Sequence, residues 1–193
     1  MSKPGSLRMD TNQAALATAF ARYAWATKDE SESVHEFMRF LSSDPAVFQR
    51  SHPVGHFTGS AWLVSADGRR VLLTHHRKLG RWLQLGGHAD GDEDLSRVAL
   101  REAEEESGLC DLVIADPHIF DIDRHWIPAR NDEPGHWHYD VRFMVRATGS
   151  EEFAVSEESL ELAWLGIEAI AGDNDADISL RRMAQKWLRR AVQ

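Results

Sequence analysis

The feature that most constrains this chain is a dense acidic run, Arg101-Glu-Ala-Glu-Glu-Glu106, in the middle of the sequence. Glu102, Glu105 and Glu106 stand at positions i, i+3 and i+4, so on a helix they share one face within roughly 100° of arc. Like charges at this spacing cost a helix on the order of a few tenths of a kcal/mol. Negative charge near a helix C-terminus also opposes the macrodipole. A bound cation offsets both costs, and oxygen ligands favour a hard divalent metal, Mg2+ or Mn2+.

The residues around this run follow a fixed spacing. The pattern G-x5-E-x7-R-E-U-x-E-E-x-G-U, with U apolar, is met at Gly87, Glu93, Arg101, Glu102, Ala103, Glu105, Glu106, Gly108 and Leu109. This pattern is the Nudix box, and the chain therefore resembles a Nudix hydrolase. The alternative, a solvated acidic helix, would have to match every fixed position by accident.

The resemblance implies a fold and a reaction. The fold is α/β, a Nudix-like α/β/α sandwich with a mixed β-sheet. The reaction is hydrolysis of the diphosphate bridge in a nucleoside diphosphate linked to another moiety, assisted by one to three divalent metals. Metal ions are needed because the diphosphate is highly anionic, and they also lower the pKa of the attacking water. We expect Mg2+, or Mn2+, as the cofactor.

The resemblance also assigns roles within the box. Glu105 and Glu106 are the first-choice metal ligands. Glu102 is either a third ligand or the group that orients or deprotonates water. A backbone carbonyl at Gly86 or Gly87 is a further expected ligand, because small residues let the chain approach the ion.

Three other box residues are expected to be mainly structural. Glu93 and Arg101 are predicted to form an ion pair that holds the loop to the helix, and Arg101 is also a candidate for substrate contact. Gly108 is predicted to end the helix with a positive φ.

A further acidic ligand often precedes the tryptophan-bearing strand in this family. Residues 155–164, which end at Trp164, occupy that place. Glu158 is the favoured ligand and Glu157 the second choice, and the alternative is a solvated acidic loop.

Ten histidines are present, and seven lie in the part of the chain that carries the box: His75, His76, His88, His118, His125, His136 and His138. His88 lies within the box loop, where it could contact a phosphate or a metal. His136 and His138 alternate on a predicted strand and so share a face, with Asp140 next along it as a candidate supporting partner. That face, with His125 as a further candidate, is a metal or phosphate site or ordinary sheet surface. Zinc is compatible with such a set, although no tight zinc signature is present.

A nucleobase needs an aromatic stacking platform. The candidates near the predicted site are Trp82, Trp126, Trp137 and Tyr139. We take Trp82 and Tyr139, together with His88 and His138, as the predicted substrate contacts. Packing in the core is the alternative for each aromatic residue.

Hydrophobic periodicity predicts the elements on either side of the box. Helices are expected at 11–27, from Ser33 (a capping box with Glu36), at 45–48, 167–171 and 178–192. Strands are expected at 56–66, 71–73, 81–85, 111–115, 119–123, 137–147 and 160–165. Residues 1–55 are assigned to an N-terminal helical extension and residues 56–193 to the Nudix hydrolase domain. The extension could be a lobe, a lid, a dimer surface or part of the core, and a homodimer is compatible with it.

Composition excludes several classes of partner. Hydrophobic residues make up 42% and charged residues 27%, as in soluble globular proteins. A net charge of −9 argues against binding to duplex nucleic acid or an anionic membrane. No membrane span or signal pattern is evident, and the single Cys110 permits no internal disulfide. We therefore expect a cytoplasmic enzyme acting on a small nucleotide-type substrate.

The sequence also bears on two other functional classes, an isomerase and a sensor. A diphosphate isomerase of this fold needs a catalytic cysteine before the box, and no cysteine stands there. A catalytically weak Nudix-fold nucleotide-binding sensor usually has an eroded box and extra C-terminal sequence, whereas this box is intact.

Overall fold

The computed structural model describes residues 11–76, 80–130, 133–154 and 159–190. Within these ranges, one mixed sheet has the strand order β4-β5-β1-β3-β2-β6. Its strands are β1 (Gly55–Val64), β2 (Arg70–His76), β3 (Arg81–His88), β4 (Leu112–Ile127), β5 (His136–Ala147) and β6 (Ser159–Gly166). β1 is parallel to β5, and the other neighbouring pairs are antiparallel. The expected mixed sheet is confirmed.

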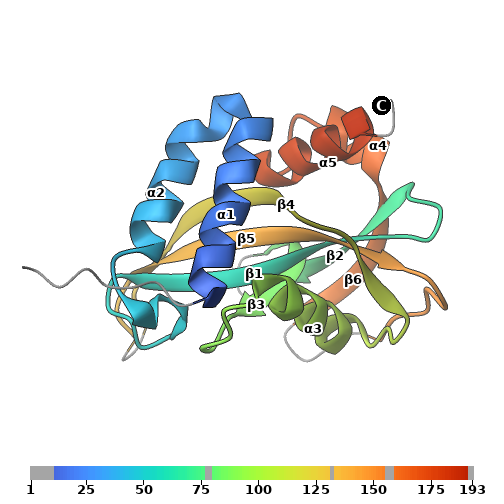
Figure 1. Ribbon diagram of the computed structural model, residues 1–193. Helices are drawn as coiled ribbons and strands as arrows, with labels where there is room; N and C mark the ends of the chain where they lie inside the picture. Colours follow the sequence, from blue (N-terminus) through green and yellow to red (C-terminus); the bar gives the residue numbers. More distant parts are fainter. Residues whose placement is uncertain (1–10, 77–79, 131–132, 155–158, 191–193) are drawn as a thin grey trace, which may run out of the picture.

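The helices are α1 (Thr11–Ala26), α2 (Ser31–Leu41), α3 (Leu95–Ser107), α4 (Ile167–Gly172) and α5 (Ile178–Arg190), with short 3-10 turns at Lys28–Glu30 and Pro45–Phe48. Figure 1 shows α3 below the central strands, α4 and α5 above them at one end, and α1 beside α2. Of the helices in the described part of the chain, none has an apolar stretch long enough to traverse a bilayer.

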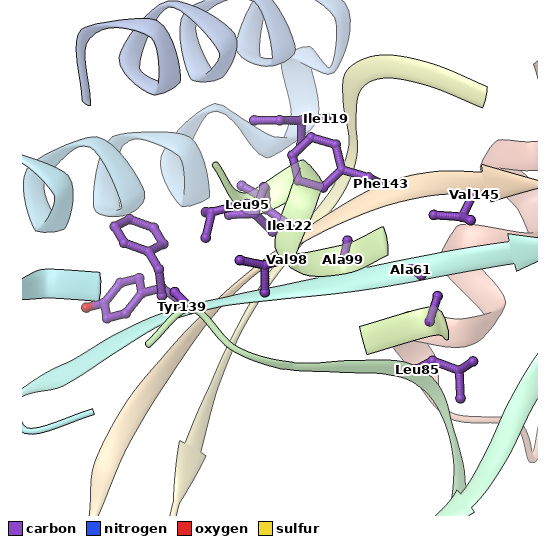
Figure 2. Close-up of a cluster of buried hydrophobic side chains, with 14 of the residues drawn as sticks. Ala61, Leu85, Leu95, Val98, Ala99, Ile119, Ile122, Tyr139, Phe143 and Val145 are labelled. Atoms are coloured by element: carbon purple, nitrogen blue, oxygen red, sulfur yellow. The ribbon is translucent and has the colours of Figure 1, made fainter. Parts of the chain in front are cut away.

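Alternation along β1 divides the core between the two faces of the sheet. Phe57, Ala61 and Leu63 belong to a cluster that also contains residues of α1, α2 and α3. Trp62 and Val64 belong to a second cluster with α4 and α5. Figure 2 shows the first cluster, where α3 contributes Leu95, Val98 and Ala99 beside Ala61, Leu85 and Val145. The helices of the sandwich thus cover both faces of β1.

Gly59 lets α3 approach β1 closely. A Cβ at this position would lie 2.7 Å from the carbonyl oxygen of Leu95 and 2.9 Å from Cβ of Val98. Any larger residue would push the helix away from the sheet. This close packing fixes the height of α3 above the strands and therefore the position of its glutamates.

The N-terminal helices pack on the sheet as part of the core. Phe37 of α2 lies edge-on to Tyr139 with ring centroids 5.3 Å apart, and Phe40 stacks on Tyr139 at 3.8 Å. Phe20 of α1 stacks on Phe57 at 6.3 Å. Of the roles considered for these helices, core packing is the one seen here. The division into two domains at residue 56 stays a prediction.

Two element predictions differ from the structure. The strands expected at 111–115 and 119–123 are one strand, β4, whose register against β5 shifts at Asp116. Pro117 looks like a break because it lacks an N–H donor, but an edge strand such as β4 tolerates it. Helix α2 begins at Ser31 rather than at Ser33, and its N-cap residue Glu30 makes no side-chain cap.

Candidate active site

The box folds as a strand, a loop and a helix. β3 brings Gly86, Gly87 and His88 alongside β1, with Gly87 opposite Gly59. Asp94 caps α3 by accepting from the backbone N–H of Arg97 at 3.1 Å. Gly108 ends the helix at φ 70°, in the left-handed region predicted from its position. These local signals hold the acidic face of α3 against the glycine loop.

Two of the predicted catalytic glutamates contact that loop directly. A Cβ on Gly87 would lie 2.4 Å from Oε2 of Glu102, so the Glu102 carboxylate occupies the space that the glycine leaves open. Glu106 Oε1 accepts a hydrogen bond from the N–H of Gly86 at 2.8 Å. Glu105 is more open to solvent, with 64% of its side chain exposed. Loop and helix therefore place carboxylate oxygens beside the backbone of residues 86–87.

Arg101 links the helix to the loop. Its guanidinium donates to Glu102 Oε1 at 2.8 Å and to the carbonyl oxygen of His88 at 3.1 Å. Its Nε also lies 3.9 Å from Glu105 Oε1. Burial raises the pKa of Glu102, and Arg101 opposes this rise. The predicted ion pair between Arg101 and Glu93 stays a prediction.

The glutamate face fits a hard divalent cation. Its donors are oxygens only, and Gly87 leaves its backbone accessible for lack of a side chain. In the described residues, the group of three potential ligand side chains whose ligand atoms lie within 4.8 Å of one another is a histidine triad, His56, His136 and His138. Glu157 and Glu158, the predicted downstream ligands, lie outside the described residues.

That triad lies across the sheet from α3. Phe57 and Tyr139 belong to the first core cluster, which packs against α1, α2 and α3. Because side chains alternate along a strand, their neighbours His56 and His138 point to the opposite face of the sheet. His56 pairs with His138 across β1 and β5, and His138 pairs with His125 across β5 and β4.

The rings of this cluster are closely packed. Ring centroids are 4.8 Å apart for His56 and His138, 4.9 Å for His56 and His136, and 5.0 Å for His88 with either His56 or His138. Burial and the neighbouring rings lower the pKa of His56 to about 3 and that of His138 to about 2. Burial and Arg50 lower the pKa of His88 to about 4. These three imidazoles are neutral at pH 7.

A buried polar network continues along the same face. Asp140 accepts hydrogen bonds from Thr58 at 2.9 Å, Ser60 at 2.7 Å, Gln84 at 3.2 Å and Arg142 at 2.7 Å. Asp140 therefore links β1, β3 and β5. Among the described residues its hydrogen-bond partners are these four side chains and not His136 or His138, which the sequence predicted it to support.

The comparison with known families decides the assignment. The NUDIX domain family matches residues 56–187, which is more than half of the chain. This chain belongs to the Nudix family. Family membership with the intact box makes it an enzyme of the Nudix pyrophosphohydrolase class. None of the curated proteins matches the sequence.

Solved Nudix structures share its fold at low sequence identity. An Ap4A hydrolase from C. elegans is 16% identical with a TM-score of 0.55, covering 70% of this chain and 97% of that chain. A MutT protein from Methanosarcina mazei Go1 is 21% identical with a TM-score of 0.54, covering 71% and 95%. The E. coli dihydroneopterin triphosphate pyrophosphohydrolase is 18% identical with a TM-score of 0.53, covering 69% and 95%. At these identities the likeness shows the fold.

The aromatic residues of this Nudix domain occupy different environments. Trp82 is half-buried on β3, packs on the second core cluster and has its ring 5.3 Å from that of His75. Tyr139 is 6% exposed and stacked on Phe40, so it acts as a core residue and its predicted contact with substrate does not fit this position. Trp126 is 50% exposed.

The two described hollows lie away from the box. One, of about 650 Å3, is lined mainly by α2. The other, of about 250 Å3, lies between α2, β4 and α5. Neither hollow is lined by the box glutamates or by the histidine triad.

Sequence reasoning missed two contributors to this region. His56 lies near the start of the mainly apolar strand β1, and the sequence does not indicate its neighbour. Its contact with His138 depends on the parallel register of β1 and β5. Arg50 forms a bidentate ion pair with Asp90 of the box loop, at 2.5 and 2.8 Å. Its charge also acts on the pKa values of Glu102 and His88. An isolated arginine in a turn carries no motif that could have indicated this.

Proposed function

We propose that this Nudix enzyme is a metal-dependent hydrolase that cleaves the diphosphate bridge of a nucleoside diphosphate linked to another moiety. The observation that carries the proposal is the contact of Glu102 and Glu106 with the Gly86-Gly87 loop. This contact brings two of the three box glutamates to the backbone of residues 86–87, and oxygen donors of this kind support an oxygen-liganded cation there.

The proposed cation is Mg2+, with Mn2+ as its substitute. Glu105, Glu106, Glu102 and the carbonyl of Gly87 would hold it, and Glu158 would add a downstream ligand. When bound, the metal neutralises phosphate charge and activates water. Glu102 is proposed as the third ligand or as the group that orients or deprotonates water.

The substrate class rests on the residues around the loop. Arg101, which donates to the His88 carbonyl, is proposed as a phosphate contact of the glutamate face. His88 and His138 are proposed as further substrate contacts from the opposite sheet face, where their rings lie 5.0 Å apart, and Trp82 as the stacking platform. The structurally similar Ap4A hydrolase and dihydroneopterin triphosphate pyrophosphohydrolase support a nucleotide-like phosphoanhydride. The exposed Cys110 suits a reducing cytoplasm.

A phosphate-release screen tests the proposal. Purified protein with Mg2+ or Mn2+ is offered nucleoside triphosphates, nucleotide sugars, ADP-ribose, NADH and dinucleoside polyphosphates, and a coupling phosphatase or pyrophosphatase releases phosphate from the phosphomonoester or pyrophosphate products. We expect one class to be cleaved much faster, with turnover reduced by several orders of magnitude in Glu105→Gln and in Glu106→Gln. Glu104→Gln is the matched control, because Glu104 is exposed and points away from this face.

The activities of the two glutamate variants and of the wild type separate the possible outcomes. Full activity of Glu105→Gln and Glu106→Gln would refute the assignment of metal ligands. Uniform inactivity of a folded, Mg2+-binding wild type would favour the nucleotide-binding sensor instead.

A further inference from the structure

We propose that His56, His136 and His138 form a second metal site, separate from the box glutamates, that binds a divalent transition metal with Zn2+ as the best fit. The three residues come from β1 and β5 and lie on the sheet face opposite α3. The inference does not depend on which substrate the enzyme hydrolyses.

The geometry of the three rings matches a tetrahedral zinc site. One nitrogen from each ring lies within 4.8 Å of the other two. Nε2 of His136 and Nε2 of His138 are 3.2 Å apart, close to the roughly 3.3 Å between two ligands 2.0–2.1 Å from a tetrahedral zinc ion. Ring centroids 4.8 to 5.1 Å apart also approach the roughly 5.2 Å of such a site. The ligand atoms, at most 4.8 Å apart, would have to approach by about 1.5 Å to reach the roughly 3.3 Å of a tetrahedral zinc site.

The hydrogen bond of His136 presents the correct nitrogen. Its Nδ1 lies 2.9 Å from the carbonyl oxygen of Pro134, which can only accept, so Nδ1 carries the proton. In the neutral ring, Nε2 then carries the lone pair, and it is this atom that accepts the hydrogen bond from Nε2 of His138 at 3.2 Å. A ligand histidine held through its other nitrogen by a backbone carbonyl is the usual arrangement at metal sites.

His56 gives an independent indication. The residue is 1% exposed, and within the described part of the chain neither of its ring nitrogens has a hydrogen-bond partner. A polar group that is buried without a hydrogen-bond partner destabilises the fold. Nearly all buried polar groups in folded proteins have partners, so an exception needs an explanation. A metal ion would supply the missing partner, because a ring nitrogen of His56 already lies within the triad.

The ligand type separates this site from the glutamate face. Imidazole nitrogen suits Zn2+ and its neighbours in the first transition row, whereas carboxylate and carbonyl oxygen suit Mg2+. Three neutral ligands leave the ion its full positive charge, so an anion is favoured in the fourth position. His88 is the alternative fourth ligand, because its ring is 5.0 Å from those of His56 and His138. The two metal sites would then meet at the loop that carries Gly87 and His88.

Zinc titration in the presence of excess Mg2+ tests the site directly. The full-length protein is stripped with a chelator, Mg2+ is added to occupy oxygen sites, and Zn2+ binding is followed by calorimetry and by elemental analysis. We expect one Zn2+ per chain. The affinity should fall more than about 100-fold in His56→Gln and in His138→Gln, because loss of an outer-shell partner alone costs roughly 10- to 100-fold.

Two controls make the result specific. His35→Gln changes an exposed histidine of α2 and should bind Zn2+ as the wild type does. Glu105→Gln should also retain Zn2+ binding, which would separate the histidine site from the box. Wild-type-like affinity in His56→Gln and His138→Gln, or equal losses in His35→Gln, would overturn the proposal.

A wild-type measurement covers the case in which the buried variants fail to fold. Co2+ replaces Zn2+ in tetrahedral nitrogen sites and then absorbs visible light strongly, whereas Co2+ on six oxygen ligands absorbs weakly. We expect the strong spectrum at one Co2+ per chain, abolished by one equivalent of Zn2+ and unaffected by Mg2+. A weak, octahedral spectrum, or no uptake of either metal, would refute the site.

Discussion

Asp121 is the centre of the buried charge network, and its replacement by asparagine should strongly destabilise the fold. The residue has no exposed surface and pairs with three cations: Arg142 at 3.2 Å, Arg182 at 2.6 Å and Lys186 at 2.5 Å. Asn keeps the volume of the side chain, so the change removes charge without leaving a cavity. The pairs it removes join β4 to β5 and to α5.

The expected loss follows from the charges left behind. Arg142 is 2% exposed and would retain Asp140 at 2.7 Å and Asp123 at 3.5 Å, while Lys186 would retain Glu30 at 2.6 Å. Removing one partner of a buried ion pair typically costs about 3–5 kcal/mol. The remaining partners place the expected value near the lower end, about 3 kcal/mol. For a chain of this size the melting temperature should fall by roughly 6–12 °C.

Urea unfolding followed by tryptophan fluorescence measures the change. The matched control is Asp90→Asn, which breaks an ion pair of comparable length with Arg50 whose side chains are 55% and 47% exposed. Exposed pairs contribute about 0–1 kcal/mol, so this variant should be near wild type. If Asp121→Asn lost no more free energy of unfolding than Asp90→Asn, the argument from burial would be refuted.

Two further predictions follow from the glycine loop and the histidine face. Gly87→Ala places a Cβ 2.4 Å from Oε2 of Glu102, so phosphate release should fall at least about tenfold with an unchanged circular dichroism spectrum. Gly172→Ala, whose Cβ would meet nothing within 4 Å, should keep full activity. The pKa values of His56 and His138 in the fold, about 3 and 2, lie below the usual 6.5, so protons bind preferentially to the unfolded chain. In chelator-treated protein the free energy of unfolding should be constant above pH 7 and fall as the pH drops below 6.5, by up to about 2 kcal/mol per histidine at pH 5. A urea midpoint that did not move between pH 7 and pH 5 would contradict the neutral state of these rings.

Local sequence signals account well for the box itself. The glutamates at i, i+3 and i+4 share a helix face by local periodicity, and the N-cap Asp94 and the C-terminal Gly108 contact backbone groups three or four residues away. Helices and tight turns close hydrogen bonds between near neighbours in the chain, so their residues can be identified before the fold is known.

The tertiary structure decided which distant residues meet. The parallel register of β1 and β5 sets His56 beside His138, and residues 82 positions apart in sequence, such as Thr58 and Asp140, share hydrogen bonds. It also buried Tyr139 under the N-terminal helices, where its type alone had suggested a stacking platform. Alternation in a strand indicates which residues share a face, but not which strand lies alongside. The sequence by itself therefore determined the acidic box helix and its loop, whereas strand order and register, which depend on packing across the whole sheet, created the histidine triad and the buried charge network.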